Sequence, residues 1–242
     1  MYDSNRRLRR EEKFLLPTAE AAYLAGRLTA LMKPDPHSAH GLYTVDSLYF
    51  DTPNADSLQD KQAGTNNRER FRLRYYNGDL SYVCLESKAN RGTVRAKASQ
   101  QVDADLFFAL ALGKSNAIEP EAPGLLGRFR MHALCKPLLP TVMVRYERAA
   151  FQYADCRITF DFDLRGGAPP RQIRTPPTPG QGEVPAKWFG FGGIPVLSPD
   201  VCILEVKYTD VLPAAVRHLL SPARLQASAV SKFELCMPAR LL

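Results

Sequence analysis

Alternation between apolar and charged residues constrains the fold of this chain more than any other feature of its sequence. In the segment RFRLRYY, Phe71, Leu73 and Tyr75 occupy every second position, and Arg72 and Arg74 lie between them. Successive side chains of a β-strand point to opposite faces of a sheet, so this pattern predicts a strand with one apolar and one basic face. Similar alternating runs predict eight strands, at about 7–15, 43–50, 68–76, 80–88, 93–101, 141–151, 156–164 and 201–208.

Helical patterns are fewer and lie between the predicted strands. Thr18 is expected to be the N-cap of an Ala- and Leu-rich helix that runs to about Met32 and ends before Pro34. Three further helices are expected near 103–112, 123–135 and 212–220. Many strands with a few interposed helices predict an antiparallel α+β protein.

Residues 1–242 are expected to form a single domain. With 45% apolar and 24% charged residues, the composition is that of an ordinary folded protein. The segment at about 166–199 holds eight of the chain's 19 prolines, which predicts a long surface excursion. Because a strand pattern resumes at Val201, the excursion is not interpreted as a domain boundary.

The sequence also predicts a cytoplasmic location and no intrinsic membrane segment. No run of roughly 18 uncharged apolar residues is present, and the basic N-terminal residues are followed by Glu11 and Glu12 instead of an apolar stretch. The cysteines are widely spaced and form no zinc-binding or disulfide motif, which is typical of a reducing compartment. They are Cys84, Cys135, Cys156, Cys202 and Cys236. The oligomeric state is left open.

Rows of arginine predict that the polar strand faces bind an anion. The basic positions of the third predicted strand are Arg68, Arg70, Arg72 and Arg74. Like charges in such a row repel one another unless water or an anion separates them. For a single strand a solvent-exposed charged face is the commoner explanation, but five or six strands here repeat the pattern. If the sheet closes into a barrel, these charges meet in an interior where they must be paired or must bind a ligand.

Carboxylates on the same basic faces predict a divalent cation beside the anion. They are Glu11, Glu86, Asp161, Asp163 and Glu205. The planar guanidinium of Arg binds phosphate at two points. A carboxylate near phosphate would be repelled unless a hard cation such as Mg²⁺ or Mn²⁺ lies between them. The net charge of +7 agrees with an anionic partner.

Eight sequence blocks in order give the chain a family resemblance. They are RREEKFLL, SLYFDT, RFRLRYY, LESK with VRAK, VRYERAAF, CRITFDFD, ILEVKY and VSKFELC. With these blocks the chain resembles the VTC domain, the polyphosphate polymerase domain of the vacuolar transporter chaperone complex, within the CYTH and triphosphate tunnel metalloenzyme superfamily. The resemblance implies an antiparallel eight-stranded β-barrel, or tunnel, with flanking helices, whose interior binds triphosphate or polyphosphate with a divalent metal.

The resemblance also implies roles for individual residues. The expected catalytic residues are Arg72, Arg74, Arg148, Arg157 and Glu205. The expected substrate-binding residues are Arg9, Lys13, Lys88, Arg95, Lys97, Lys207 and Lys232. The expected metal ligands are Glu205, Glu11 and Asp161. Arg9 stands where the wider superfamily has the first acid of Glu-x-Glu-x-Lys, which favours the polymerase branch.

Some assignments have alternatives. Lys97 and Arg95 compete for one position of the family pattern, and Glu86 is interpreted as a counter-ion for Arg72 in preference to a second metal ligand. Arg68 and Arg70 lie either at the tunnel mouth or in solvent. Asp161 and Asp163 either hold a metal through water or form salt bridges to lysines, and Asp161 is the preferred metal ligand of the two.

The expected activity is a metal-dependent transfer of the γ-phosphoryl group of ATP to a polyphosphate chain, with Mn²⁺ or Mg²⁺ as the cofactor. Hydrolysis of inorganic triphosphate or polyphosphate, and binding of polyphosphate without turnover, are the alternatives. Nucleic acid is not an expected partner, because few aromatic side chains share the charged faces on which bases would stack.

Overall fold

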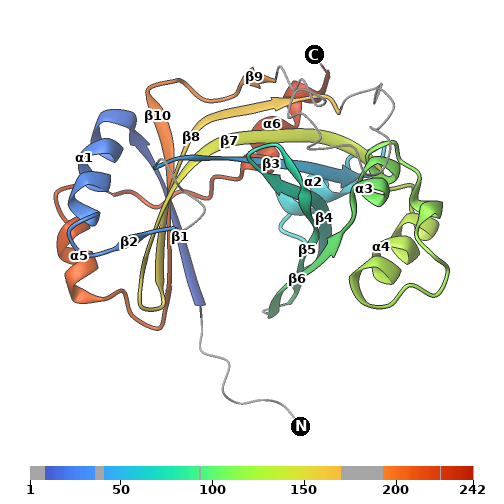
Figure 1. Cartoon of the computed structure of the whole chain (residues 1–242), viewed down its shortest axis with the longest axis horizontal. Coiled ribbons are helices and arrows are strands. Elements are labelled where there is room, and N and C mark those ends of the chain that lie inside the picture. Colours follow the sequence, from blue (N-terminus) through green and yellow to red (C-terminus); the bar gives the residue numbers. More distant parts are fainter. Residues whose placement is uncertain (1–8, 36–40, 93, 170–192, 224, 242) are drawn as a thin grey trace, which may run out of the picture. The chain divides into compact units, whose positions relative to one another are not determined.

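The computed structural model describes residues 9–35, 41–92, 94–169, 193–223 and 225–241 (Figure 1). The chain divides into two compact units. Unit 1 comprises Met1–Thr44, Tyr146–Leu164 and Leu197–Ser231, and unit 2 comprises Val45–Arg145, Arg165–Val196 and Lys232–Leu242. The single domain expected over 1–242 stays a prediction, and the two units are described in turn.

Eight long strands follow one another in the order β1-β10-β8-β7-β3-β4-β5-β6. They are β1 (Arg9–Pro17), β3 (Tyr43–Asp51), β4 (Asn67–Tyr76), β5 (Asp79–Arg91), β6 (Val94–Val102), β7 (Leu139–Tyr153), β8 (Cys156–Gly167) and β10 (Val201–Thr209). Each corresponds to one of the eight predicted strands, and the antiparallel α+β class is confirmed. Two short strands lie off this path: β2 (Lys33–Pro34) pairs with β7, and β9 (Ile194–Pro195) pairs with β8. Because β1 and β6 end the order, the hydrogen-bonded path of the described strands is open.

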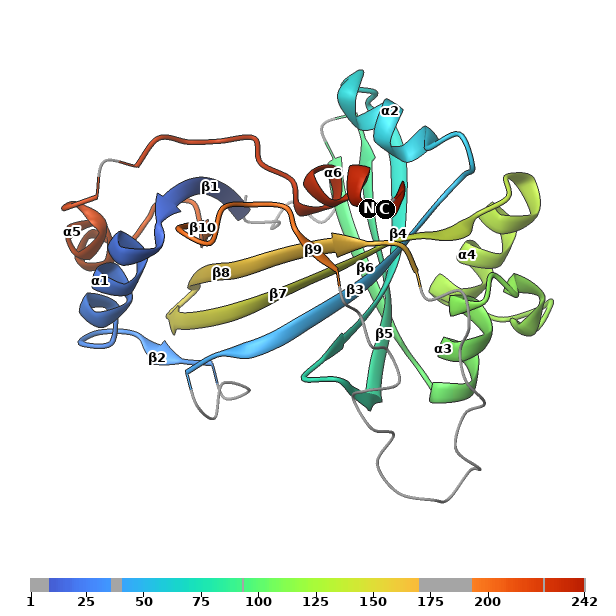
Figure 2. The same ribbon diagram turned by 90° about the horizontal axis from the view of Figure 1, so that it is seen from above.

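In unit 1, one face of β1, β10 and β8 is apolar and packs against two helices. The helices are α1 (Thr18–Leu28) and α5 (Ala214–Leu220), which lie side by side (Figure 2). Phe14, Leu204 and Phe160 are buried on this sheet face, and Leu24 and Val216 are buried on the helices. The other face of the same strands therefore presents the alternate, charged residues.

In unit 2, β3, β4 and β5 bury their apolar face under α3 (Ala104–Ala111) and α4 (Gly124–Cys135). Phe129 of α4 makes edge contacts with the rings of Phe50 and Phe71, at centroid distances of 4.9 and 5.2 Å. Leu73 and Leu85 are fully buried in the same core. As in unit 1, this burial leaves the arginine-rich face of the strands uncovered by α3 and α4.

The four predicted helices are present, with one correction at a cap. The N-cap of α1 is Pro17, and Thr18 is the first helical residue; its hydroxyl donates to the carbonyl of Pro199. Two short helices were not predicted, α2 (Asp56–Gln62) and α6 (Lys232–Cys236). The 3₁₀ helices η1 (Ser115–Ala117) and η3 (Pro238–Leu241) complete the described elements.

Gly166 allows α6 to pack closely against the end of β8. A Cβ atom at Gly166 would lie 2.7 Å from Cβ and 2.9 Å from Cα of Cys236, which real structures do not tolerate. In α2, Lys61 forms an ion pair with Glu234 of α6. These contacts hold α6 and its Phe233 in unit 2. Across the described part of the chain, every helix is too short or too polar to cross a bilayer.

Candidate functional site

The polar face of unit 2 is formed by β4, β5 and β6 and is strongly basic. The strand register places Arg72 opposite Glu86 and Arg70 opposite Lys88, and it places Lys88 opposite Lys97. Residues directly opposite on antiparallel strands share a face of the sheet. The predicted residues Arg72, Arg74, Lys88 and Lys97 therefore lie together.

Glu86 is the anion that neutralises part of this face. Its carboxylate lies 2.6 Å from Nη2 of Arg72 and 2.7 Å from Nζ of Lys97, and Nη1 of Arg74 lies 3.8 Å away. Burial alone would raise the pKa of Glu86, but Arg72, Arg74 and Lys97 outweigh it and lower the pKa to about 2. Glu86 thus occupies the place of a counter-ion, as the preferred interpretation of the sequence states.

Strand β3 adds two hydroxyl groups to the arginine cluster. Nη1 of Arg72 donates to the Tyr49 hydroxyl at 2.7 Å, and Nε of Arg74 donates to the Ser47 hydroxyl at 3.1 Å. Burial of the Tyr49 phenol would raise its pKa, yet the charges of Arg72, Arg74 and Arg70 lower that pKa to about 8. The tyrosine therefore reports a positive potential that Glu86 does not cancel. Sequence analysis placed neither Tyr49, which it interpreted as structural, nor Ser47 in the site, although both alternate in phase with the polar face of β3.

In unit 1, Arg148 and Asp161 form a buried pair. Nε and Nη2 of Arg148 donate to Oδ1 and Oδ2 of Asp161 at 2.6 and 2.8 Å. The Asp161 side chain is 0% exposed and that of Arg148 is 11% exposed. Burial would lower the pKa of Arg148, but Asp161 and Tyr146 raise it well above its usual value. The geometry favours a counter-ion role for Asp161, because both of its oxygens accept from the guanidinium; its role as a metal ligand stays a prediction.

Strands β1 and β10 place acids and lysines alternately on the polar face of unit 1. Lys13 lies opposite Glu205 in the register, and Glu11 lies opposite Lys207. The ion pairs run along each strand, with 3.2 Å between Lys13 and Glu11 and 2.7 Å between Lys207 and Glu205. These four predicted residues form one charged patch in which negative and positive side chains balance.

This patch offers a donor set that fits a hard divalent cation. The Glu205 side chain is 8% exposed. Thr159 lies opposite it in the register, and its buried hydroxyl oxygen has no hydrogen-bond partner among the described residues. No group of three or more His, Cys, Asp or Glu side chains in the described ranges could hold a metal by itself. Mg²⁺ and Mn²⁺ sites in phosphoryl transfer are commonly made by one or two carboxylates with phosphate oxygens, and Glu205 and Glu11 match that pattern.

Arg157 lies on the same sheet face of unit 1 and is held by two residues that sequence analysis did not single out. Its Nη2 lies 2.7 Å from Oδ2 of the buried Asp35 and 3.2 Å from the Tyr43 hydroxyl. In the register Arg157 lies opposite Lys207, a like charge. Asp35 lies in a short irregular segment just after β2, so no alternation in the sequence could have indicated it.

The remaining predicted residues are less constrained. Arg95 is exposed on β6, and Lys232 is half-buried at the start of α6. Arg9 is the first residue of β1, and its side chain lies outside the described part of the chain. Asp163 is exposed with a φ angle of 44°, which interrupts the alternation of β8 just after Asp161. Most of the excursion predicted at about 166–199 lies outside the described residues.

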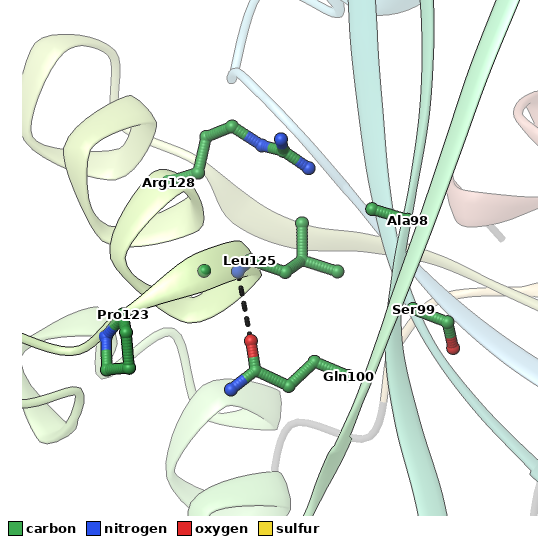
Figure 3. A pocket seen from close by; sticks show the side chains of 7 residues that line it. Ala98, Ser99, Gln100, Pro123, Leu125 and Arg128 are labelled. Carbon is green, nitrogen blue, oxygen red and sulfur yellow. Dashed lines mark hydrogen bonds between the residues drawn. The ribbon is translucent and has the colours of Figure 1, made fainter. Parts of the chain in front are cut away.

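A pocket of about 490 Å³ in unit 2 lies apart from these residues (Figure 3). It lies between β6 and the beginning of α4, where Gln100 accepts hydrogen bonds from the backbone amides of Leu125 and Leu126. The lining residues are Ala98, Ser99, Gln100, Pro123, Gly124, Leu125 and Arg128. The Arg128 guanidinium pairs with Glu69 at 3.3 Å. None of the predicted site residues lines this pocket.

The fold is shared with solved structures. A candidate adenylate cyclase from Bacillus halodurans matches with a TM-score of 0.55 at 10% identity, covering 93% of this chain and 94% of that chain. The PH1819 protein of Pyrococcus horikoshii OT3 matches with a TM-score of 0.47 at 14% identity, covering 96% and 100%. A candidate adenylate cyclase from Vibrio parahaemolyticus has a TM-score of 0.48 at 13% identity, covering 95% and 97%. The first likeness, with a TM-score above 0.5, shows that the chain shares the fold of that protein.

The family itself follows from the sequence. The VTC domain profile matches residues 8–239, so the chain belongs to the VTC domain family, and the predicted resemblance is confirmed. No curated protein matches the chain by sequence.

Proposed function

We propose that the protein is a metal-dependent polyphosphate polymerase that transfers the γ-phosphoryl group of ATP to a polyphosphate chain. The observation that supports this most is the clustering of Arg72, Arg74, Lys88 and Lys97 on one strand face, in a chain of the VTC family. The resemblance to the VTC domain implies a triphosphate or polyphosphate ligand, and a polymer of phosphate presents a repeating anion that several basic side chains can hold. ATP and polyphosphate are the proposed substrates.

In this proposal the basic side chains hold phosphate groups in line for transfer. Phosphoryl transfer needs little covalent chemistry from the protein, because most of the rate enhancement comes from positioning and from neutralising charge. Arg72 and Arg74 of unit 2 and Arg148 and Arg157 of unit 1 are the proposed catalytic arginines. The proposed substrate-binding residues are Arg9, Lys13, Lys88, Arg95, Lys97, Lys207 and Lys232.

The acidic residues have separate roles in this proposal. Asp161 holds the Arg148 guanidinium in one orientation through two hydrogen bonds. Glu205, assisted by Glu11, would hold Mn²⁺ or Mg²⁺, which supplies charge neutralisation at the phosphate oxygens when bound. A general base is not required, since the terminal oxygen of an acceptor phosphate is already ionised near neutral pH. The cytoplasmic location stays a prediction.

Product length tests the proposal directly. The purified protein is incubated with ATP and Mn²⁺, with or without a short polyphosphate primer, and the products are separated on a gel that resolves phosphate polymers. We expect chains longer than the primer, dependent on the metal. Orthophosphate with progressively shorter chains would instead show a hydrolase. Salt-sensitive binding of polyphosphate without turnover would show a binding protein, and either result would overturn the polymerase assignment.

A further inference from the structure

Three basic residues lie in one row across β4, β5 and β6. Arg70 lies opposite Lys88, and Lys88 lies opposite Lys97, so no acidic residue interrupts the row. Directly opposed side chains on antiparallel strands have Cβ atoms about 5 Å apart, and like charges at that distance destabilise the pairing. The neighbouring row differs, because there Arg72 lies opposite Glu86. Glu86 also pairs with Lys97 of the Arg70 row at 2.7 Å, so the need for a further anion in this row centres on Arg70.

The surroundings of Arg70 do not provide that anion. No ion pair joins Arg70 to a carboxylate among the described residues, and its Nη1 atom is buried without a hydrogen-bond acceptor there. The Phe233 ring lies against the guanidinium, with 5.1 Å between the ring centroid and the guanidinium carbon. Asp51 is the acid whose charge reaches Arg70, but its Oδ1 accepts from the backbone amides of Thr52 and Ser57. A donor that is buried and unsatisfied is costly unless a ligand accepts from it.

Arg68, two residues earlier on the same strand, shows the contrast. Its Nη1 donates to the backbone carbonyl of Thr65 at 2.9 Å and approaches that of Asp60 at 3.5 Å. Backbone acceptors therefore already satisfy Arg68. The two arginines have the same charge and strand face, and only Arg70 has a buried donor with no acceptor.

We propose that Arg70 binds phosphate, and that Arg70, Lys88 and Lys97 form a subsite for phosphate groups beyond those held at Arg72 and Arg74. Residues two apart on a strand are separated by roughly 7 Å, so the two rows would contact different phosphate groups of one extended anion. The inference rests on the proposed function in that it assigns this face to polyphosphate. It adds that the site recognises chain length.

The test compares Arg70→Gln with Arg68→Gln by calorimetry, without ATP or metal. The probes are inorganic triphosphate and a long-chain polyphosphate. We expect Arg70→Gln to weaken binding of the long chain by about tenfold or more, the effect of one lost charged hydrogen bond, and to weaken triphosphate binding much less. The slope of log affinity against log salt should fall by about one for the long chain. Arg68→Gln should match the wild type.

The outcomes separate this inference from the proposed function. If the wild type binds no polyphosphate, the proposed function fails and the inference fails with it. If the wild type binds and elongates polyphosphate but the two variants behave alike, or Arg70→Gln weakens both probes equally, only the inference is overturned. A purely structural role of Arg70 under Phe233 would instead lower the thermal stability of Arg70→Gln and leave its affinities unchanged. Phe233→Leu removes the ring and keeps the charge, so we expect it to retain the preference for long chains; loss of that preference would overturn the subsite.

Discussion

The polar faces of the two units differ in their balance of charge. In unit 1, Glu11, Glu205 and Asp161 alternate with lysines and arginines, and each acid has a basic partner. In unit 2, Glu86 alone on β4, β5 and β6 faces the basic residues of that side of the sheet. A balanced face can hold a cation among its acids, whereas a face with surplus positive charge favours phosphate. We therefore expect the metal to bind in unit 1, and the surplus positive charge that attracts phosphate to lie in unit 2.

The central acids of the two units are both buried, but they differ in their basic partners. Asp161 is fully buried against the Arg148 guanidinium, while Glu86 shares its charge with Lys97, whose side chain is 60% exposed. A fixed, sealed pair is suited to orienting one arginine. An acid that is shared among several partners, one of which is exposed, can give up that partner to an incoming anion at lower cost.

Asp161→Asn should produce the largest change, because it leaves Arg148 as a buried charge without its counter-ion. We expect the free energy of unfolding to fall by about 3–5 kcal/mol. Urea denaturation followed by circular dichroism measures this change: the urea concentration at the midpoint of unfolding should fall, and the dependence of the free energy on urea concentration should stay the same. Asp163→Asn, an exposed acid on the same strand, is the matched control and should change little. A variant as stable as the wild type that binds Mn²⁺ more weakly would favour the metal-ligand role for Asp161.

Glu205→Gln should abolish turnover while leaving the basic face of unit 2 intact. We expect the rate of polyphosphate synthesis to fall on the order of 100-fold, because a metal contributes several kcal/mol of charge stabilisation. Binding of polyphosphate without metal should be retained. The control is Glu12→Gln on the opposite face of β1, where Glu12 accepts from the Tyr208 hydroxyl at 3.1 Å. Full metal-dependent activity in Glu205→Gln would disprove the division of roles between the units.

Glu86→Gln should strengthen the binding of anions, whereas the two preceding substitutions each cause a loss. Removing the only acid of the unit 2 row strengthens the attraction for anions, so we expect the affinity for inorganic triphosphate to rise by about tenfold. Isothermal calorimetry at two salt concentrations measures this, and the gain should shrink at the higher one. Glu69→Gln provides the control, because Glu69 lies on the other face of β4 and pairs with Arg128 and His132 at 3.3 and 3.4 Å. A loss of affinity in Glu86→Gln would mean that this acid chiefly positions Arg72.

The pH dependence of Glu86 follows from its lowered pKa. The folded-state pKa of about 2 lies below the ordinary value of 4.5. The stabilisation is therefore present above pH 4.5 and is lost as the pH falls toward 2. Relative to Glu86→Gln, the wild type should lose stability more steeply between pH 4.5 and 2 in acid denaturation. Parallel curves for the two proteins would show that the arginines do not stabilise the carboxylate.

Alternation along single strands predicted much of this architecture. The eight strands and the face on which Arg72, Glu205 and Lys13 lie follow from a period of two, because that period depends on local backbone geometry alone. The partner of each acid depends on strand register, which tertiary contacts decide. Asp161 could therefore not be matched to Arg148 from the sequence, nor Glu86 to Lys97.

Short or irregular segments account for the features that were missed. Helix α6 has five residues, too few for a helical period to be visible, so neither its existence nor the contact of Phe233 with Arg70 could be predicted. Asp35 follows a two-residue strand and becomes relevant only because the fold brings it to Arg157. Tyr49 did alternate correctly, but an aromatic ring in a strand indicates packing as readily as a site.

Tyr49 offers the smallest but most direct measurement of the charge difference between the units. Its folded-state pKa of about 8 is lower than the usual 10, because Arg72, Arg74 and Arg70 outweigh the effect of burial. Ionisation of Tyr49 should therefore stabilise the fold as the pH rises from about 8 toward 10.

Ultraviolet difference absorbance should show one phenolate forming near pH 8, and this transition should be missing in Tyr49→Phe. Saturation with polyphosphate should move this transition toward pH 10, since bound phosphate neutralises the same arginines. The pair Arg157 and Tyr43 in unit 1 has its own carboxylate in Asp35, so Tyr43→Phe should leave the transition in place. A transition that polyphosphate does not move would show that the anion binds elsewhere.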